Sequence, residues 1–172
     1  RALGAKVKEG LEGMLRRDSE RIYKRLVMRS LADKAAIELP DEFLKRWISF
    51  TSEKPITPED LETGYSAYAE GLKKQLLEDR ILEKYGLEAK GGEINEFAMQ
   101  YMRDQFAQYG IPAPEGEKLQ EMAGRMLSDR DQVRKMRDSI VEHKLIAHFK
   151  AMLSPRDKHV PFEEFLILAR TA

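Results

Sequence analysis

The amino-acid sequence predicts an all-α protein, an elongated multi-helix body with projecting helical arms. Apolar residues recur three or four positions apart along most of its 172 residues, and no alternating strand pattern of useful length is present. The longest clear helical pattern, residues 58–85, would span about 42 Å at ~1.5 Å per residue. Because a compact domain of this size has a radius of gyration of about 16 Å, such a helix must cross or protrude from its own globule.

The first helical pattern covers residues 3–35 and carries a narrow apolar stripe, beginning with Leu3 and Val7, in a heavily charged background. Gly10 and Gly13 each cost about 1 kcal/mol relative to alanine inside a helix, so this helix needs a neighbour to lean on. A solvated helix that packs on one side is the simpler interpretation.

The alternative interpretation is that residues 1–36 form an arm that links the chain to a further domain. The chain opens on arginine without an initiator methionine, which suggests a fragment of a longer protein. We expect residues 1–172 to form a single helical domain of that protein.

A break at Pro40 is followed by a second helix, because proline fits a first helical turn and two acidic residues follow at the positive end of the helix. Phe43, Leu44, Trp47 and Ile48 recur at helical spacing and are expected to form the buried face of this helix. Trp47, the only tryptophan, is expected in the core rather than as a platform for a ligand.

The central helix, residues 58–85, has a physical reason for each of its ends. Thr57 caps the start, Pro58 takes the first helical position, and Asp60 stands where the acid of a capping box falls. Gly86 supplies the stop. The apolar residues form two neighbouring rows, which require partners on more than one side. These rows are Leu61, Tyr65, Tyr68, Leu72 and Leu76, and then Leu77, Ile81 and Tyr85.

Residues 93–109 predict a helix that is apolar around more than half of its circumference. A helix of this kind is usually enclosed in a core, and the alternative is a sticky surface, because methionine and aromatic side chains adapt to many shapes. One stripe contains Ile94, Phe97, Ala98 and Tyr101, and the other contains Met99, Met102, Phe106 and Tyr109.

A turn at residues 110–116 and a short helix at 119–126 come next. Ser128 with Asp131 predicts a capping box for a helix that runs to about Leu153. The last turns of this helix are apolar nearly all round, so that end is either buried or sticky.

The final pattern, residues 162–169, predicts a short helix after a stop at Ser154 and Pro155. The two sticky regions supply our candidate contact residues for apolar segments of a partner. They are Met99, Met102, Phe106, Tyr109, Ile146, Phe149 and Met152.

The composition restricts the choice of partners. Thirty basic and thirty acidic residues cancel to a net charge of zero, whereas nucleic acids and anionic membranes attract excess positive charge. We therefore expect neither as a direct partner. The absence of cysteine excludes disulfides and thiol chemistry.

The sequence carries no positive sign of a catalytic or metal site. His143 and His148 are five residues apart and point in different directions on a helix, and His159 has no partner at metal-ligand spacing. Carboxylates alternate with lysine and arginine, as in surface ion pairs. We expect no catalytic residue, no cofactor and no metal.

Taken in order, five stretches make the chain resemble the C-terminal region of bacterial trigger factor, the ribosome-associated folding chaperone, in the form found in Bacteroides-like bacteria. The stretches are residues 37–40 (IELP), 41–47 (DEFLKRW), 72–77 (LKKQLL), 109–110 (YG) and 160–165 (VPFEEF). The resemblance covers essentially the whole chain.

The resemblance implies a cytoplasmic, ATP-independent chaperone domain whose helical arms cradle unfolded or nascent polypeptides. Two parts of that family are not present in the sequence, namely the N-terminal ribosome-docking loop and the FKBP-like prolyl isomerase domain. The resemblance therefore implies contact with the ribosome only through that N-terminal part, and no isomerase activity in this chain.

Two other functions remain open, and so does a homodimer. The same apolar surfaces suit a helical scaffold that binds one defined folded partner or a second copy. A periplasmic chaperone of the SurA kind has a similar helical organisation. Saturable one-to-one binding without suppression of aggregation would favour the scaffold, and a secretion signal upstream would favour the periplasmic chaperone.

Overall fold

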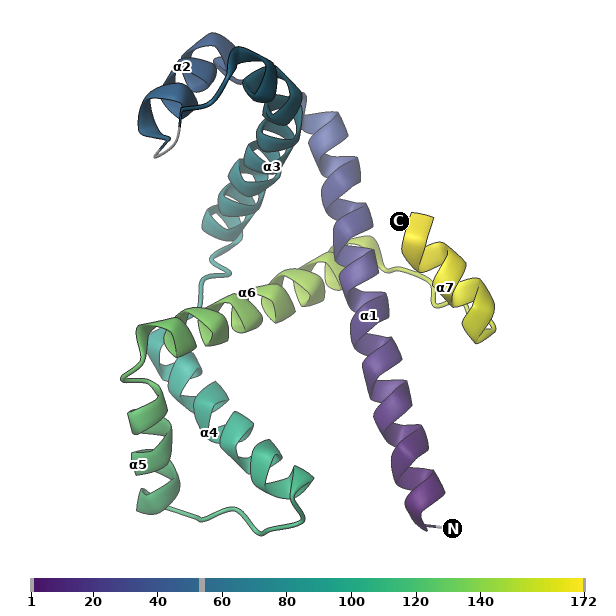
Figure 1. Ribbon diagram of the computed structural model, residues 1–172. Coiled ribbons are helices and arrows are strands. Elements are labelled where there is room, and N and C mark those ends of the chain that lie inside the picture. The colour runs from purple at the N-terminus through teal and green to yellow at the C-terminus, as the bar shows by residue number, and fades with distance from the viewer. Residues whose placement is uncertain (1, 53–54, 172) are drawn as a thin grey trace. The chain divides into compact units, whose positions relative to one another are not determined.

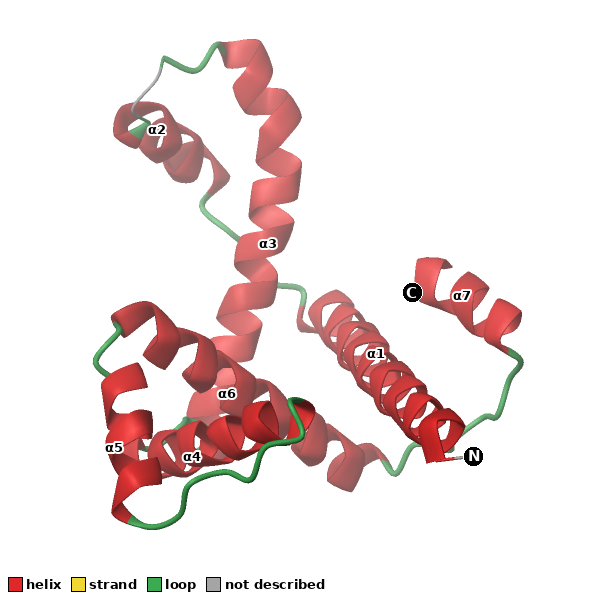
Figure 2. Ribbon diagram, turned by 60° about the horizontal axis from the view of Figure 1, so that its bottom comes forward, coloured by secondary structure: helices red, strands yellow, loops and turns green. Residues whose placement is uncertain are grey.

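The computed structural model describes the backbone of residues 2–52 and 55–171, and their side chains except those of residues 2–7, 9 and 171. The described residues form seven α-helices and contain no strand (Figures 1 and 2). The all-α prediction is confirmed. The side chains of Leu3 and Val7, which open the predicted first stripe, lie outside the described residues. In chain order the helices are α1 (Ala2–Ala35), α2 (Asp41–Thr51), α3 (Pro58–Tyr85), α4 (Gly91–Gln108), α5 (Glu117–Met126), α6 (Arg130–Leu153) and α7 (Phe162–Thr171).

The chain divides into two compact units. The first unit contains Arg1–Lys84 and Arg156–Ala172, and therefore α1, α2, α7 and nearly all of α3. The second unit contains Tyr85–Pro155, with α4, α5 and α6.

In the first unit, polar contacts connect α1 to two other helices. The ammonium group of Lys24 lies 3.2 Å from the carboxylate of Glu78 on α3. The guanidinium of Arg25 donates a hydrogen bond of 3.1 Å to the carbonyl oxygen of Ala169 on α7. Met28, between these contacts and the end of α1, is buried. The second half of α1 thus has neighbours, whereas a Cβ at Gly10 or Gly13 would meet nothing within 4 Å.

The ends of α3 match the prediction. Thr57 Oγ1 accepts a hydrogen bond of 3.1 Å from the backbone N–H of Asp60, and the same hydroxyl donates to the Asp60 carboxylate at 2.7 Å. Gly86 follows the last helical residue with φ of 62°, a left-handed conformation that favours glycine. The sequence signals at both ends therefore act as the local chemistry requires.

In the second unit, α4 packs against both α5 and α6 (Figure 1). The buried core between them contains Ile94, Ala98, Ala123, Met136 and Ile140. Ala98 on α4 and Ala123 on α5 are fully buried, and their small side chains let these two helices approach closely. The expectation that the helix over residues 93–109 contributes to a core is confirmed for this side of it.

One carboxylate joins the start of α4 to α6. Glu93 accepts a hydrogen bond of 2.8 Å from the backbone N–H of Lys90, and its carboxylate lies 2.7 Å from the ammonium group of Lys144. That ammonium group also donates to the carbonyl oxygen of Glu88 at 2.9 Å. The hydrogen bond from Lys144, followed by the one from Lys90, lowers the pKa of Glu93 below its ordinary value of 4.5.

The predicted cap of α6 is wrong by one residue. Asp129, not Ser128, is the N-cap, and its side chain accepts a hydrogen bond of 2.8 Å from the backbone N–H of Asp131. The hydroxyl of Ser128 instead donates to the carbonyl oxygen of Gly124 at 3.1 Å. Because this bond ties Ser128 to the end of α5, its oxygen does not cap the next helix.

Candidate functional site

Three aromatic side chains on α2 lie largely in solvent. Phe43 is 55% exposed, Trp47 is 52% exposed and Phe50 is 87% exposed. Positions 43, 47 and 50 fall within an arc of about 60°, since a helix turns ~100° per residue. The rings of Phe43 and Trp47 stack with a centroid separation of 6.3 Å and an interplanar angle of 20°. We call these three residues the α2 aromatic face.

This face corrects two expectations. The predictions that Phe43 and Trp47 lie on the buried face of α2 and that Trp47 lies in the core are wrong. Leu44 and Ile48, on the neighbouring part of the apolar arc, are half-buried, and α2 contains no fully buried residue. The apolar arc of α2 is wider than the surface that neighbouring helices cover. Its aromatic part therefore faces solvent.

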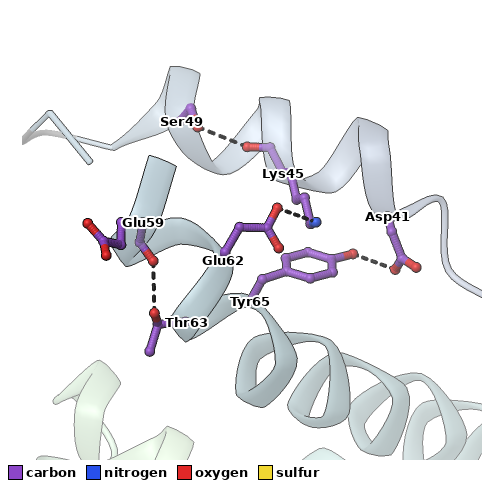
Figure 3. A network of polar contacts seen from close by, with 7 residues as sticks. All are labelled: Asp41, Lys45, Ser49, Glu59, Glu62, Thr63 and Tyr65. Carbon is purple, nitrogen blue, oxygen red and sulfur yellow. Dashed lines mark hydrogen bonds and ion pairs between the residues drawn. The ribbon is translucent and has the colours of Figure 1, made fainter. Parts of the chain in front are cut away.

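The opposite side of α2 is attached to α3 by polar contacts (Figure 3). The hydroxyl of Tyr65 donates a hydrogen bond of 2.6 Å to the carboxylate of Asp41. Lys45 forms an ion pair with Glu62 at 2.6 Å, and its ammonium group lies 5.1 Å from the centre of the Tyr65 ring. These contacts hold α2 by its polar side and leave the aromatic face outward.

The same contacts shift the pKa values of Tyr65 and Lys45. Burial raises the pKa of Tyr65 to about 12, and the hydrogen bond to Asp41 acts in the same direction. The hydrogen bond to Glu62 raises the pKa of Lys45 above its ordinary value of 10.5. Tyr65 is therefore neutral and Lys45 charged at physiological pH, and both serve to position α2.

A shallow depression of about 370 Å³ lies between α2 and the start of α3. Phe50 and Leu61 supply its apolar surface. The rest of its lining is polar or charged and consists of Glu42, Lys45, Arg46 and Ser49. An apolar side chain could rest against Phe50 there, with charged groups beside it.

In the second unit, the four candidate residues on α4 and after it differ in exposure. Tyr109, at the end of α4, is 77% exposed, and the nearby Ile111 is also exposed. Met99, Met102 and Phe106 are half-buried. Met99 packs against the core and also lines a shallow depression of about 570 Å³.

This second depression lies on α4 beside α6. Phe97, Met99 and Ile140 form its apolar floor. Its polar lining consists of Glu93, Glu96, Gln100 and Arg103. It therefore combines a small apolar surface with charges of both signs, as the depression on α2 does.

The three candidates near the end of α6 differ in how far they are buried. Ile146 and Phe149 are each only 5% exposed, whereas Met152 is 63% exposed and the adjoining Leu153 is also exposed. Met152 is thus the member of this group that solvent reaches. The structure thus places the candidates in two groups, one on or just after α4 and one near the end of α6. No candidate belongs to the α2 aromatic face.

Phe50, the most exposed residue of the α2 aromatic face, is therefore not among the residues predicted from the sequence. The signal was present, because Phe50 lies seven residues after Phe43 and three after Trp47, which is one face of a helix. What the pattern lacked was any indication that this face is uncovered.

Two of the three histidines, His143 and His148, pack against aromatic rings. The ring centres of His148 and Tyr85 are 4.2 Å apart, and those of His143 and Phe97 are 6.3 Å apart. In the described part of the chain, no three His, Cys, Asp or Glu side chains gather in a group that could hold a metal ion. None of the described helices combines the length and the apolar character that crossing a bilayer requires.

The protein belongs to the class of all-helical proteins that present apolar side chains to solvent, as proteins do at sites of contact with other proteins, membranes or ligands. Residues 19–168 match the family described as "Probable trigger factor, C-terminal domain", and the chain belongs to that family. Membership gives it a chaperone-type role. The match is to the C-terminal domain and includes no prolyl isomerase domain.

No curated protein matched the chain in a direct comparison. No solved structure matched it either.

Proposed function

We propose that this chain is an ATP-independent chaperone domain that holds unfolded or newly made polypeptides against its exposed apolar side chains. The observation that carries the proposal is the α2 aromatic face. Three aromatic residues that are more than half exposed would be costly to leave in water if they had no partner. An unfolded segment would gain affinity by covering them.

The second unit contributes further contacts in this proposal. Tyr109 and Met152 are exposed and would touch a bound segment directly. Met99, Met102 and Phe106 are half-buried and would contribute their outer edges. Ile146 and Phe149 would act from beneath, by supporting the surface around Met152.

The shape and chemistry of these surfaces suit weak, sequence-tolerant binding. Both depressions are shallow and mix apolar floors with charged rims. Methionine and aromatic side chains accommodate many shapes at low cost. Equal numbers of basic and acidic residues, together 35% of the chain, would keep the protein dissolved while apolar surface is exposed.

The remaining features of the proposal follow from the family. The two units would serve one chaperone domain that acts in the cytoplasm. Contact with the ribosome and isomerisation of prolyl bonds would belong to other parts of a trigger factor. The clients would be unfolded chains rather than one folded partner.

Suppression of aggregation tests the proposal. The wild-type chain should reduce light scattering from an aggregating, chemically unfolded protein without ATP. The Phe43→Ser/Phe50→Ser variant should do so much less well. A control variant, Glu70→Ser/Lys74→Ser, removes an exposed ion pair of α3 and the same number of side chains, and it should retain wild-type suppression.

Circular dichroism must show that both variants keep the wild-type helix content. A wild-type chain that fails to suppress aggregation but binds a folded protein saturably, one to one, would replace the chaperone by a scaffold. Equal suppression by all three proteins would remove the α2 aromatic face from the site.

A further inference from the structure

Four arginines form a row along α1. Arg17, Arg21, Arg25 and Arg29 are spaced four residues apart, and all four are exposed. At ~1.5 Å per residue, neighbouring members are about 6 Å apart along the axis and the row extends about 18 Å. We call this row the arginine ladder.

The ladder is not neutralised by the protein itself. Among the described residues, no ion pair within 4.0 Å involves Arg17, Arg21 or Arg29. Three acidic residues of α1 lie near the row: Asp18 and Glu20 fall between Arg17 and Arg21, and Asp33 follows Arg29 by four residues. Residues 16–34 nevertheless carry seven basic and three acidic side chains.

Like charges four residues apart oppose helix formation. Several other cations of the first unit are in ion pairs, for example Lys24 with Glu78 and Lys45 with Glu62. The ladder therefore lies on a segment with an excess of positive charge, in a chain whose net charge is zero.

One member of the ladder shows which group it can bind. Arg25 donates a hydrogen bond of 3.1 Å to the carbonyl oxygen of Ala169, in the last turn of the apolar helix α7. A guanidinium binds a carboxylate more strongly than a neutral carbonyl, with two parallel hydrogen bonds where the geometry allows. The other three arginines have no such acceptor among the described residues.

Apolar side chains on the same helix are exposed as well. Leu11 is 51% exposed, and Met14 and Leu26 are each 45% exposed. α1 therefore offers cationic and apolar groups to the same partner. This combination fits a polypeptide in which acidic and apolar residues alternate.

We propose that the arginine ladder is a docking surface for acidic, apolar-containing segments of unfolded polypeptides. The inference rests on the proposed chaperone function and names a class of client for it. Carboxylates of the client pair with the ladder while its apolar residues contact the exposed side chains of α1. A single-stranded nucleic acid is the weaker candidate, because stacking of bases needs aromatic side chains and Tyr23 is the one aromatic residue of α1.

Binding of two labelled, unstructured peptides to the 172-residue chain tests the ladder. The peptides have equal length and equal apolar content, and one carries aspartate and glutamate where the other carries lysine. Fluorescence anisotropy measures each dissociation constant. The ladder variant is Arg17→Gln/Arg21→Gln/Arg29→Gln, which keeps Arg25 and its bond to α7.

The matched control is Arg130→Gln/Arg134→Gln/Arg137→Gln, which removes the same charge from an exposed part of α6. Wild type should bind the acidic peptide more tightly than the basic one. The ladder variant should bind the acidic peptide about tenfold more weakly, since exposed ion pairs contribute modestly each, and the control should not. Raising the salt concentration from about 0.01 to 0.15 M shortens the Debye length from about 30 to 8 Å. This should reduce the difference between the dissociation constants of the acidic and the basic peptide for wild type.

Three results would overturn the inference. Unchanged affinity of the ladder variant for the acidic peptide would remove the ladder from the site while leaving the chaperone function in place. Failure of wild type to bind either peptide would contradict the chaperone function itself. Tighter binding of an RNA oligonucleotide than of the acidic peptide, lost in the ladder variant, would assign the surface to nucleic acid.

Discussion

Replacing Phe50 by serine should weaken client binding strongly and barely affect folding. A phenylalanine side chain presents about 150–250 Å², and 87% of Phe50 is in solvent. If a bound segment covers half of that exposed area, it removes roughly 90 Å² from water, which contributes about 2 kcal/mol at ~25 cal/mol per Å². The dissociation constant should therefore rise about 30-fold, since ~1.4 kcal/mol corresponds to a factor of ten.

The effect on the free energy of unfolding should be much smaller. Only the small unexposed fraction of the Phe50 side chain loses contacts within the protein, which is worth well under about 1 kcal/mol on the same scale. Serine and phenylalanine also differ little in helix propensity. The variant should keep its helix content and its thermal midpoint.

The single tryptophan makes a direct assay feasible. Trp47 belongs to the α2 aromatic face, so its fluorescence reports this surface without interference from other tryptophans. Titration with an unfolded polypeptide that lacks tryptophan should shift the emission of Trp47 to shorter wavelength as water leaves its surface. The same titration curve gives the dissociation constant of wild type and variant.

A second phenylalanine supplies the contrast. Phe149 on α6 is 5% exposed, so Phe149→Ser should lower the free energy of unfolding by about 3–5 kcal/mol, as large-to-small core substitutions do. Wild-type affinity in the Phe50→Ser variant, or a Trp47 emission that clients leave unchanged, would show that the α2 aromatic face does not bind them.

Three further predictions concern stability and titration. Gly64→Ala in α3 should raise the free energy of unfolding by about 0.5–1 kcal/mol and the thermal midpoint by about 2 °C, because a Cβ at Gly64 would meet nothing within 4 Å; an unchanged midpoint would contradict this. Because the pKa of Glu93 is lowered, its pairing with Lys144 stabilises the protein above pH 4.5, and this contribution disappears as the pH falls through the folded-state pKa. The difference in thermal midpoint between wild type and Glu93→Gln should therefore shrink as the pH is lowered. A difference that stays constant with pH would refute this. Because the pKa of Tyr65 is raised from 10.0 to about 12, its hydrogen bond to Asp41 stabilises the protein below pH 10, and this stabilisation is lost as the pH rises to 12. An absorbance titration of tyrosinate should therefore show one tyrosine that ionises at higher pH than the others, and this tyrosine should be missing in Tyr65→Phe.

Local sequence signals located the helices well because their causes are local. The hydroxyl oxygen of Thr57 accepts a hydrogen bond from the backbone N–H of Asp60 in the first turn of α3, and the Asp60 carboxylate accepts one from that hydroxyl. Gly86 adopts the left-handed conformation directly after the last helical residue. The error at the start of α6 arose where two helices lie so close in sequence that Ser128 had a choice of partners.

The candidate contact surface was predictable in part. The apolar pattern over residues 93–109 predicted more apolar surface than packing against one neighbouring helix can cover. In the structure this segment contains both the buried Ile94 and the exposed Tyr109. The arginine ladder was also visible as a spacing of four, but it is concealed by a net charge of zero. Its importance depends on Arg17, Arg21 and Arg29 having no ion pair within 4.0 Å among the described residues, which is a property of the folded first unit.

The sequence by itself determined that the chain is all-helical, where the helices begin and end to within a residue or two, and which side of each is apolar. The tertiary structure alone decided which apolar residues are covered. Trp47 and Phe149 both lie on apolar faces, yet one is half in solvent and the other is buried. The physical reason is that periodicity defines the direction in which a side chain points, whereas burial requires another helix in that direction, and the position of that helix is encoded far away in the chain.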